Sequence, residues 1–207
     1  ESDPTVDEIA QKLGENREAV LRSMEAIIEP ISIYESIEFH EWEIERFARA
    51  GVDFFYAALL PNIEEAIGIA KAIEYTKIPY IISFTIQADG CLIDGTTIHE
   101  AIERIETSVK YKPAFYMTNC VHPWIVKEAL MKPFNQTKLV KERFLGLQAN
   151  TSPLSYKELD NSAVLHSSEP EEFAQAMKEL EQLSEIMSVS QEHLSRTFKK
   201  DIQARAC

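Results

Sequence analysis

Residues 114–123 carry the sequence AFYMTNCVHP, and the rest of the chain is organised around this stretch. Its apolar run predicts a strand that is buried on both faces. The strand ends at Cys120, which follows Asn119, and Pro123 then begins a helix. In proteins that repeat a strand and a helix, chemistry is placed at the C-terminal ends of the strands. We therefore expect any active site of this chain to lie around Cys120.

The same alternation of strand and helix extends in both directions. Apolar runs at residues 52–58, 78–86 and 143–150 predict further buried strands, and residues 163–166 are a candidate for a fifth. Segments with apolar residues at helical spacing lie between these runs. This pattern predicts βαβ units with right-handed crossovers and a parallel sheet. The expected fold class is therefore α/β, with about four to five parallel strands and helical segments at both ends.

A longer helix is predicted over residues 37–50, ahead of the first strand. Its apolar positions include Phe39, Trp42, Ile44 and Phe47, which we expect to face the core. Trp124, in the helix that follows Cys120, is expected to be a core residue in the same way.

Charge and cysteine content argue against several classes of protein. The net charge of −13 repels phosphate backbones and therefore argues against binding to nucleic acid or to an anionic membrane. No stretch approaches the ~20 apolar residues of a membrane span, and the acidic first residues resemble neither a signal nor a transit peptide. The three cysteines are odd in number and widely spaced, which predicts a reducing, cytoplasmic location.

The two ends of the chain are predicted to be separate helical segments. Residues 1–35 predict a helical hairpin whose first helix ends at Gly14, and they resemble the helix-turn-helix region of bacterial sigma factors. Residues 184–207 resemble part of the helix-turn-helix of AraC-type transcriptional regulators. These pieces suggest a non-enzymatic DNA-binding or interaction protein as an alternative function. The nine acidic and three basic residues of the first segment favour a packing hairpin instead, and a solvated helix is the simpler interpretation of the second.

Residues 38–180, within an expected α/β region of 36–183, resemble the homocysteine S-methyltransferase family. The strings that carry the resemblance are AGVDFF at 50–55, PYIISF at 79–84, DGCLIDGT at 89–96, TNC at 118–120 and QANT at 148–151. The family folds as a (β/α)8 TIM barrel and depends on zinc, so the resemblance implies that Cys120 is the first of three zinc-ligating cysteines. It also implies a small-molecule thiol substrate, homocysteine, and a methyl donor, as in methionine biosynthesis.

The family's chemistry explains why such a site uses thiolates. The thiol of homocysteine is mostly protonated at neutral pH and is then a weak nucleophile. Coordination to Zn²⁺ deprotonates the sulfur and leaves it electron density to attack an activated methyl group. Three protein sulfurs leave the fourth tetrahedral position of the metal for the substrate.

The chain departs from the family at the other two ligands. The family's second and third cysteines form an adjacent pair in a Gly-Gly-Cys-Cys-Gly strand end, and this chain has no adjacent cysteines. The zinc site is therefore incomplete, which leaves open an inactive member of the family. An acidic side chain that some members use on the substrate amine would fall at Ala58. Since a barrel needs eight strands, we also expect a partial barrel, with a homo-oligomer covering its open edges.

Several polar side chains are candidates for the site. Asn119 and Asn150 both end predicted strands, so their amides either bind polar atoms of the substrate or satisfy the backbone of nearby loops. His122 is a candidate nitrogen ligand two residues from Cys120, although a histidine beside a helix start is commonly a surface residue. Cys91 follows a turn glycine and is expected to be an inert thiol, while Cys207 lies at the end of the chain. No residue is assigned a catalytic role.

Overall fold

The computed structural model describes residues 6–14, 17, 31–159, 162, 164–183 and 187–188. The chain divides into two compact units, Glu1–Ile31 and Ser32–Cys207. In the first unit, helix α1 spans Val6–Leu13, and Gly14 follows it with a left-handed φ of +70°. The predicted first helix of the hairpin is therefore present, whereas the predicted second helix lies outside the described residues except for Arg17, which is helical.

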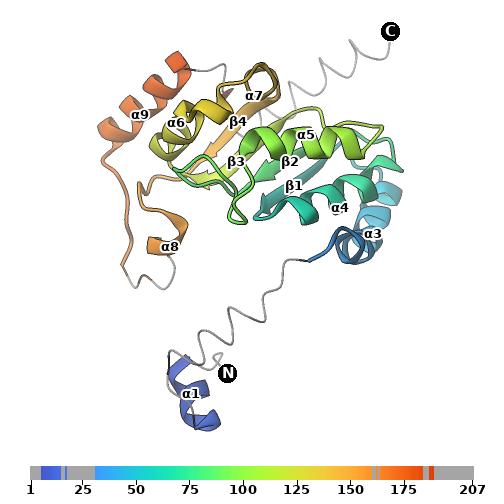
Figure 1. Cartoon of the computed structure of the whole chain (residues 1–207), viewed down its shortest axis with the longest axis horizontal. Helices are drawn as coiled ribbons and strands as arrows, with labels where there is room; N and C mark the ends of the chain where they lie inside the picture. The colour runs from blue at the N-terminus through green and yellow to red at the C-terminus, as the bar shows by residue number, and fades with distance from the viewer. Residues whose placement is uncertain are drawn as a thin grey trace. The chain divides into compact units, whose positions relative to one another are not determined.

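The second unit is built on a parallel sheet, as the alternation of apolar runs predicts. Its strands pair in the sequential order β1-β2-β3-β4-β5, of which Figure 1 labels the first four. The strands are β1 (Phe55–Leu60), β2 (Tyr80–Phe84), β3 (Tyr116–Val121), β4 (Phe144–Ala149) and the two-residue β5 (Met187–Ser188). The helices that connect β1 to β4 are α4 (Ile63–Glu74), α5 (Ile98–Ser108), α6 (Pro123–Met131) and α7 (Lys138–Arg143). This arrangement is that of a partial (β/α)8 barrel.

Three shorter elements and a long first helix complete the unit. Helix α3 spans Ile33–Ala50, and Gly51 ends it with a φ of +78°. The 3₁₀ helix η1 covers Pro133–Asn135, and α8 covers Tyr156–Leu159. Helix α9 spans Pro170–Leu183 and packs against α6, where Lys127 forms a 2.8 Å ion pair with Glu179. No helix among the described residues has the length and apolar character needed to cross a membrane.

The fifth strand does not lie where the sequence suggested. Residues 164–166 form no strand, and the side chains of Val164 and Leu165 are exposed. Instead, Met187 pairs with Gly146 of β4. A strand over residues 164–166 is therefore wrong, since Val164 and Leu165 are too exposed for a buried strand, and residue 163 lies outside the described residues.

The sheet curls as a barrel does. Its outer face packs against α4, α5, α6 and α7 in the main core (Figure 1). The inner face carries a separate, smaller apolar cluster around Ile81, Phe115 and Met117. Tyr56 of β1 donates a 3.3 Å hydrogen bond to Oε1 of Gln148 on β4. Because two strands lie between β1 and β4, this contact requires strong curvature of the sheet.

The orientation of α3 differs from the prediction. Phe39 is 71% exposed and Trp42 is 64% exposed, so the expectation that they face the core is wrong. Trp124, at 48% exposed, is also not a core residue. The face of α3 that meets α4 instead contains Ser36, which is fully buried and donates to the carbonyl oxygen of Glu65. A small side chain lets the two helices approach closely, and this close approach fixes the rotation of α3.

A close contact between the two helices predicts a destabilising substitution. An added Cβ at Gly68 would lie 2.4 Å from Cβ of Ser36 and 2.8 Å from the carbonyl oxygen of Ile33. We expect Gly68→Ala to lower the free energy of unfolding by about 1–3 kcal/mol, although alanine favours a helix by roughly 1 kcal/mol over glycine. Urea denaturation measures the change. Adding Ser36→Gly should recover part of the loss, and a Gly68→Ala chain as stable as the wild type would contradict this packing.

Candidate functional site

The C-terminal end of β3 presents Cys120 through an irregular backbone. The pairing of β3 with β4 shifts register between Asn119 and Val121, and Cys120 between them has a left-handed φ of +58°. Such a bulge changes the direction in which a side chain points. The Cys120 side chain is consequently exposed at the strand end, although the strand around it is buried.

Asn119 joins the ends of three neighbouring strands. Its side chain is almost fully buried, and Oδ1 accepts hydrogen bonds from Ser83 Oγ on β2 at 2.6 Å and from the backbone N–H of Leu59 on β1 at 3.2 Å. Its Nδ2 lies 3.5 Å from Sγ of Cys120 and donates to it. Leu59 has a φ of +59° at a second bulge. The Asn119 amide therefore couples both bulges and points its N–H toward the thiol.

Ser83 is a site residue that the sequence analysis missed. It is fully buried within the apolar run of β2 and lies on the inner face, next to Asn119. A single hydroxyl inside an otherwise apolar strand is the signal that singles it out, because buried polar groups need partners.

Asn150 lies at the same end of the sheet as Asn119. Its backbone N–H donates a 3.0 Å hydrogen bond to the carbonyl oxygen of Val121, which places the end of β4 beside the end of β3. Its side-chain Oδ1 accepts a long, 3.4 Å hydrogen bond from the backbone N–H of Ser152. The described geometry thus brings Asn119, Cys120 and Asn150 to one end of the sheet, while substrate binding by the two amides stays a prediction.

His122 is buried and not the surface residue that its position suggested. Its Nδ1 accepts a 3.2 Å hydrogen bond from the backbone N–H of Trp124 and so caps the N-terminus of α6. The ring proton must then sit on Nε2, which lies 3.3 Å from Oγ of Ser168 and can donate to it. Burial lowers the pKa of His122. Both ring nitrogens are engaged in structural hydrogen bonds, so His122 does not offer a free nitrogen ligand next to Cys120.

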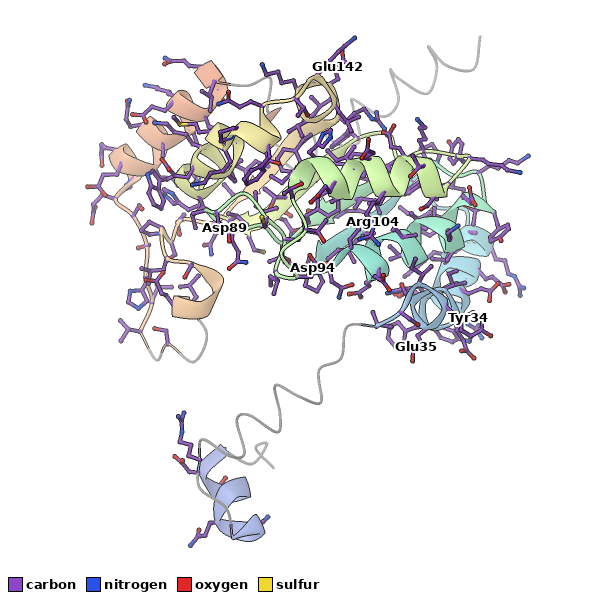
Figure 2. All side chains as sticks on the ribbon, viewed as in Figure 1. Tyr34, Glu35, Asp89, Asp94, Arg104 and Glu142 are labelled. Atoms are coloured by element: carbon purple, nitrogen blue, oxygen red, sulfur yellow. The ribbon has the colours of Figure 1, made fainter. Side chains whose placement is uncertain are left out.

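The loop between β2 and α5 contains Cys91 among acidic side chains. Burial raises the pKa of the Cys91 thiol, and the charges of Asp89, Glu100 and Asp94 raise it further. Asp94 holds the loop in place, since its carboxylate accepts a 2.7 Å hydrogen bond from the backbone N–H of Ile63 at the start of α4. Figure 2 shows Asp89 and Asp94 on this loop. A thiol with a raised pKa stays protonated at neutral pH, which agrees with an inert Cys91.

A buried amide also anchors this loop. Asn135 donates from Nδ2 to the carbonyl oxygen of Gly90 at 2.8 Å and to that of Ala129 at 3.0 Å. Its Oδ1 accepts from the backbone N–H of His99. Gly90 has a φ of +93°, and a Cβ there would lie 2.8 Å from Nδ2 of Asn135. Asn135 thus fixes the loop beside α6, another role that sequence reasoning missed.

Sequence comparison identifies the family of this chain. The family profile described as Homocysteine S-methyltransferase matches residues 6–199. The chain belongs to the homocysteine S-methyltransferase family. No curated protein matches the chain in the comparison. The family match extends into the segments that resemble sigma factors and AraC-type regulators. Those two resemblances stay predictions. The AraC-like segment lies almost entirely outside the described residues.

The described residues of this homocysteine S-methyltransferase family member do not by themselves fit a zinc ion. Within the part of the chain that the structure describes, no group of three histidine, cysteine or acidic residues is placed to hold a metal. Cys120 is exposed, but neighbouring His122 uses both ring nitrogens elsewhere. A zinc site needs three protein ligands and one open position. Cys120 is therefore a single candidate ligand and not a zinc centre.

Proposed function

We propose that the sheet end around Cys120 binds homocysteine, or its methylated product methionine, as the substrate site of a homocysteine S-methyltransferase-like protein. Family membership over residues 6–199 supports the substrate class. The position of Cys120 is the observation that carries the proposal: the one exposed side chain of β3 is a thiol at the strand end, where the fold places chemistry.

The amides beside Cys120 suit the binding of an amino acid that has a sulfur in its side chain. Asn150 makes one long side-chain hydrogen bond, so its amide retains capacity for the polar atoms of a substrate. Oδ1 of Asn119 accepts from Ser83 and Leu59, and its Nδ2 donates to Cys120, so in this proposal Asn119 mainly fixes the shape of the site.

Methyl transfer needs a sulfur nucleophile and a donor with a good leaving group. The substrate thiol loses its proton, its sulfur forms a bond to the methyl carbon, and the donor's heteroatom leaves with the electron pair of the broken bond. In the family, zinc favours the first of these events. Since the donor set described around Cys120 does not fit zinc, we propose that this chain binds the amino acid but has no methyltransferase activity on its own.

Protection of Cys120 tests the binding site separately from activity. Methionine has no thiol and does not consume an alkylating reagent, so it serves as the probe. At ten times its Kd, methionine should slow the alkylation of Cys120 by about tenfold, because only the free protein reacts. A short unstructured peptide with a single cysteine, added to the same sample, is the control and should react at an unchanged rate. Peptide mass spectrometry measures both rates, and an unprotected Cys120 at saturating methionine would overturn the proposed site.

A further inference from the structure

Helix α3 carries two faces of opposite character. One face meets α4 and includes the buried residues Ser36 and Ile44. The other face carries Ser32, Glu35, Phe39, Trp42, Arg46 and Arg49. These six residues are separated by alternating steps of three and four, which places them in one stripe along a helix. We call this stripe the α3 seam.

The centre of the α3 seam is aromatic and exposed. Phe39 is 71% exposed and Trp42 is 64% exposed, and the guanidinium of Arg46 lies 4.2 Å from the centroid of the Trp42 ring. Glu35 is held at the other end of the seam by the capping box, in which Ser32 donates to its carboxylate. Figure 2 shows Glu35 on the side of α3 that points away from α4. Large exposed aromatic groups flanked by charges are typical of an interaction surface.

The charges of the seam make it complementary to itself. In an antiparallel pair of α3 helices with a two-fold axis between Phe39 and Trp42, Phe39 of one copy faces Trp42 of the other. The same register places Glu35 of one copy opposite Arg46 of the other, so the aromatic contact and the ion pair each occur twice. A parallel pair would instead place Glu35 opposite Glu35 and Arg46 opposite Arg46, and like charges in contact are unfavourable.

We propose that the α3 seam binds the α3 seam of a second copy of this chain in this antiparallel register. This surface lies on a helix, and is distinct from the open sheet edges at which a homo-oligomer was predicted. Four aromatic rings that bury ~150 Å² each give about 600 Å², which with the flanking side chains makes a small interface. The remaining glutamates of α3, at positions 38, 41, 43 and 45, leave the helix acidic overall. The dimer is therefore weak and is governed by the complementary charges of the seam.

Charge reversal at the two ends of the seam tests both the surface and the register. Glu35→Arg alone places arginine opposite arginine, and Arg46→Glu alone places glutamate opposite glutamate. Each variant should raise the Kd of the homodimer by at least about tenfold, because juxtaposed like charges oppose association. A mixture of the two variants restores both opposite-charge pairs, so the mixture should form a heterodimer with a Kd near that of the wild type. Sedimentation equilibrium of the full chain over a range of concentrations measures all four samples.

Controls separate association from folding. Glu35→Arg removes a helix-capping group, so circular dichroism and thermal unfolding must show that the helix is retained. Trp42→Ala, which leaves the capping box intact, should also give a monomer. A wild type that stays monomeric at several hundred micromolar would overturn the proposal. A dimer that survives all three substitutions, or a mixture that does not associate, would also overturn it. So would Trp42 fluorescence that is shielded from a quencher in a particle of monomer mass, because another part of the chain would then cover the seam.

Discussion

Replacing Arg143 with methionine should lower the free energy of unfolding by about 3 kcal/mol, because it removes one of the two cations that pair with a half-buried acid and leaves two backbone carbonyls without their donor. Arg143 lies at the end of α7, and its Nε donates to the carboxylate of Glu106 on α5. Its Nη1 donates to the carbonyl oxygen of Ala114 at 2.9 Å, and its Nη2 to that of Pro113 at 2.6 Å. One guanidinium therefore joins two helices to the segment that leads into β3. Urea denaturation measures the loss.

A second arginine serves as the matched control. Arg104 forms a 3.5 Å ion pair with Glu64, and both side chains are 45% exposed. Because exposed ion pairs contribute about 0–1 kcal/mol, Arg104→Met should leave stability nearly unchanged. Equal losses of unfolding free energy in the Arg143→Met and Arg104→Met chains would show that the partly buried Arg143–Glu106 pair contributes no more to stability than the exposed pair.

The pH dependence of stability should change with Arg143 in a defined direction. Burial raises the pKa of the Glu106 carboxyl, but hydrogen bonds from Lys112 and Arg143 outweigh burial, and the pKa is lowered overall. A lowered pKa contributes stability above the pKa of the unfolded chain, about 4.3, and this contribution is lost as the pH falls through the folded pKa. The difference in the free energy of unfolding between wild type and Arg143→Met should therefore have its largest value at pH 7 and should shrink as the pH falls below about 4.

Replacing Asn119 with alanine should be the most disruptive change within the proposed site. The substitution leaves Ser83 Oγ and the backbone N–H of Leu59 without their acceptor, and each buried group left unpaired costs about 1–3 kcal/mol. We expect a loss of about 3 kcal/mol in the free energy of unfolding. Because Asn119 also donates to Cys120, the rate of Cys120 alkylation should change in the variant at temperatures where it is fully folded.

Asn150 offers the matched comparison, since it ends the adjacent strand with the same side chain. Its amide accepts one hydrogen bond at 3.4 Å and is only half-buried, so Asn150→Ala should cost less than about 0.5 kcal/mol. A denaturation midpoint that moves equally in both asparagine variants would contradict the coupling of three strand ends through Asn119.

The regular part of the fold could be predicted from the sequence, because its signals are local. Apolar runs predicted the parallel strands, and the run that ends at Cys120 predicted the strand end around which the site is proposed. The orientation of α3 could not be predicted, because the helix has apolar residues on two faces. The face that is buried contains the close contact between Ser36 and Gly68, which are far apart in sequence.

The partners of the site residues were also beyond sequence reasoning. Asn119 binds groups that are 36 and 60 residues away in the chain, on strands brought together by the curvature of the sheet. His122 could not be recognised as a buried helix cap, because its partner Ser168 lies 46 residues further on. The two-residue β5 has no apolar run of its own and forms where it meets β4.

Zinc content measured together with methyl transfer tests the central claim most directly. The purified chain, loaded with Zn²⁺ and then dialysed against a weak chelator, is assayed for metal and for methionine formed from homocysteine with sulfonium and quaternary ammonium methyl donors. We predict well below one zinc per chain, the same value in Cys120→Ser as in the wild type, and no methionine formed. One zinc per chain that is lost in Cys120→Ser but kept in Cys91→Ser, with methyl transfer to homocysteine, would contradict the account.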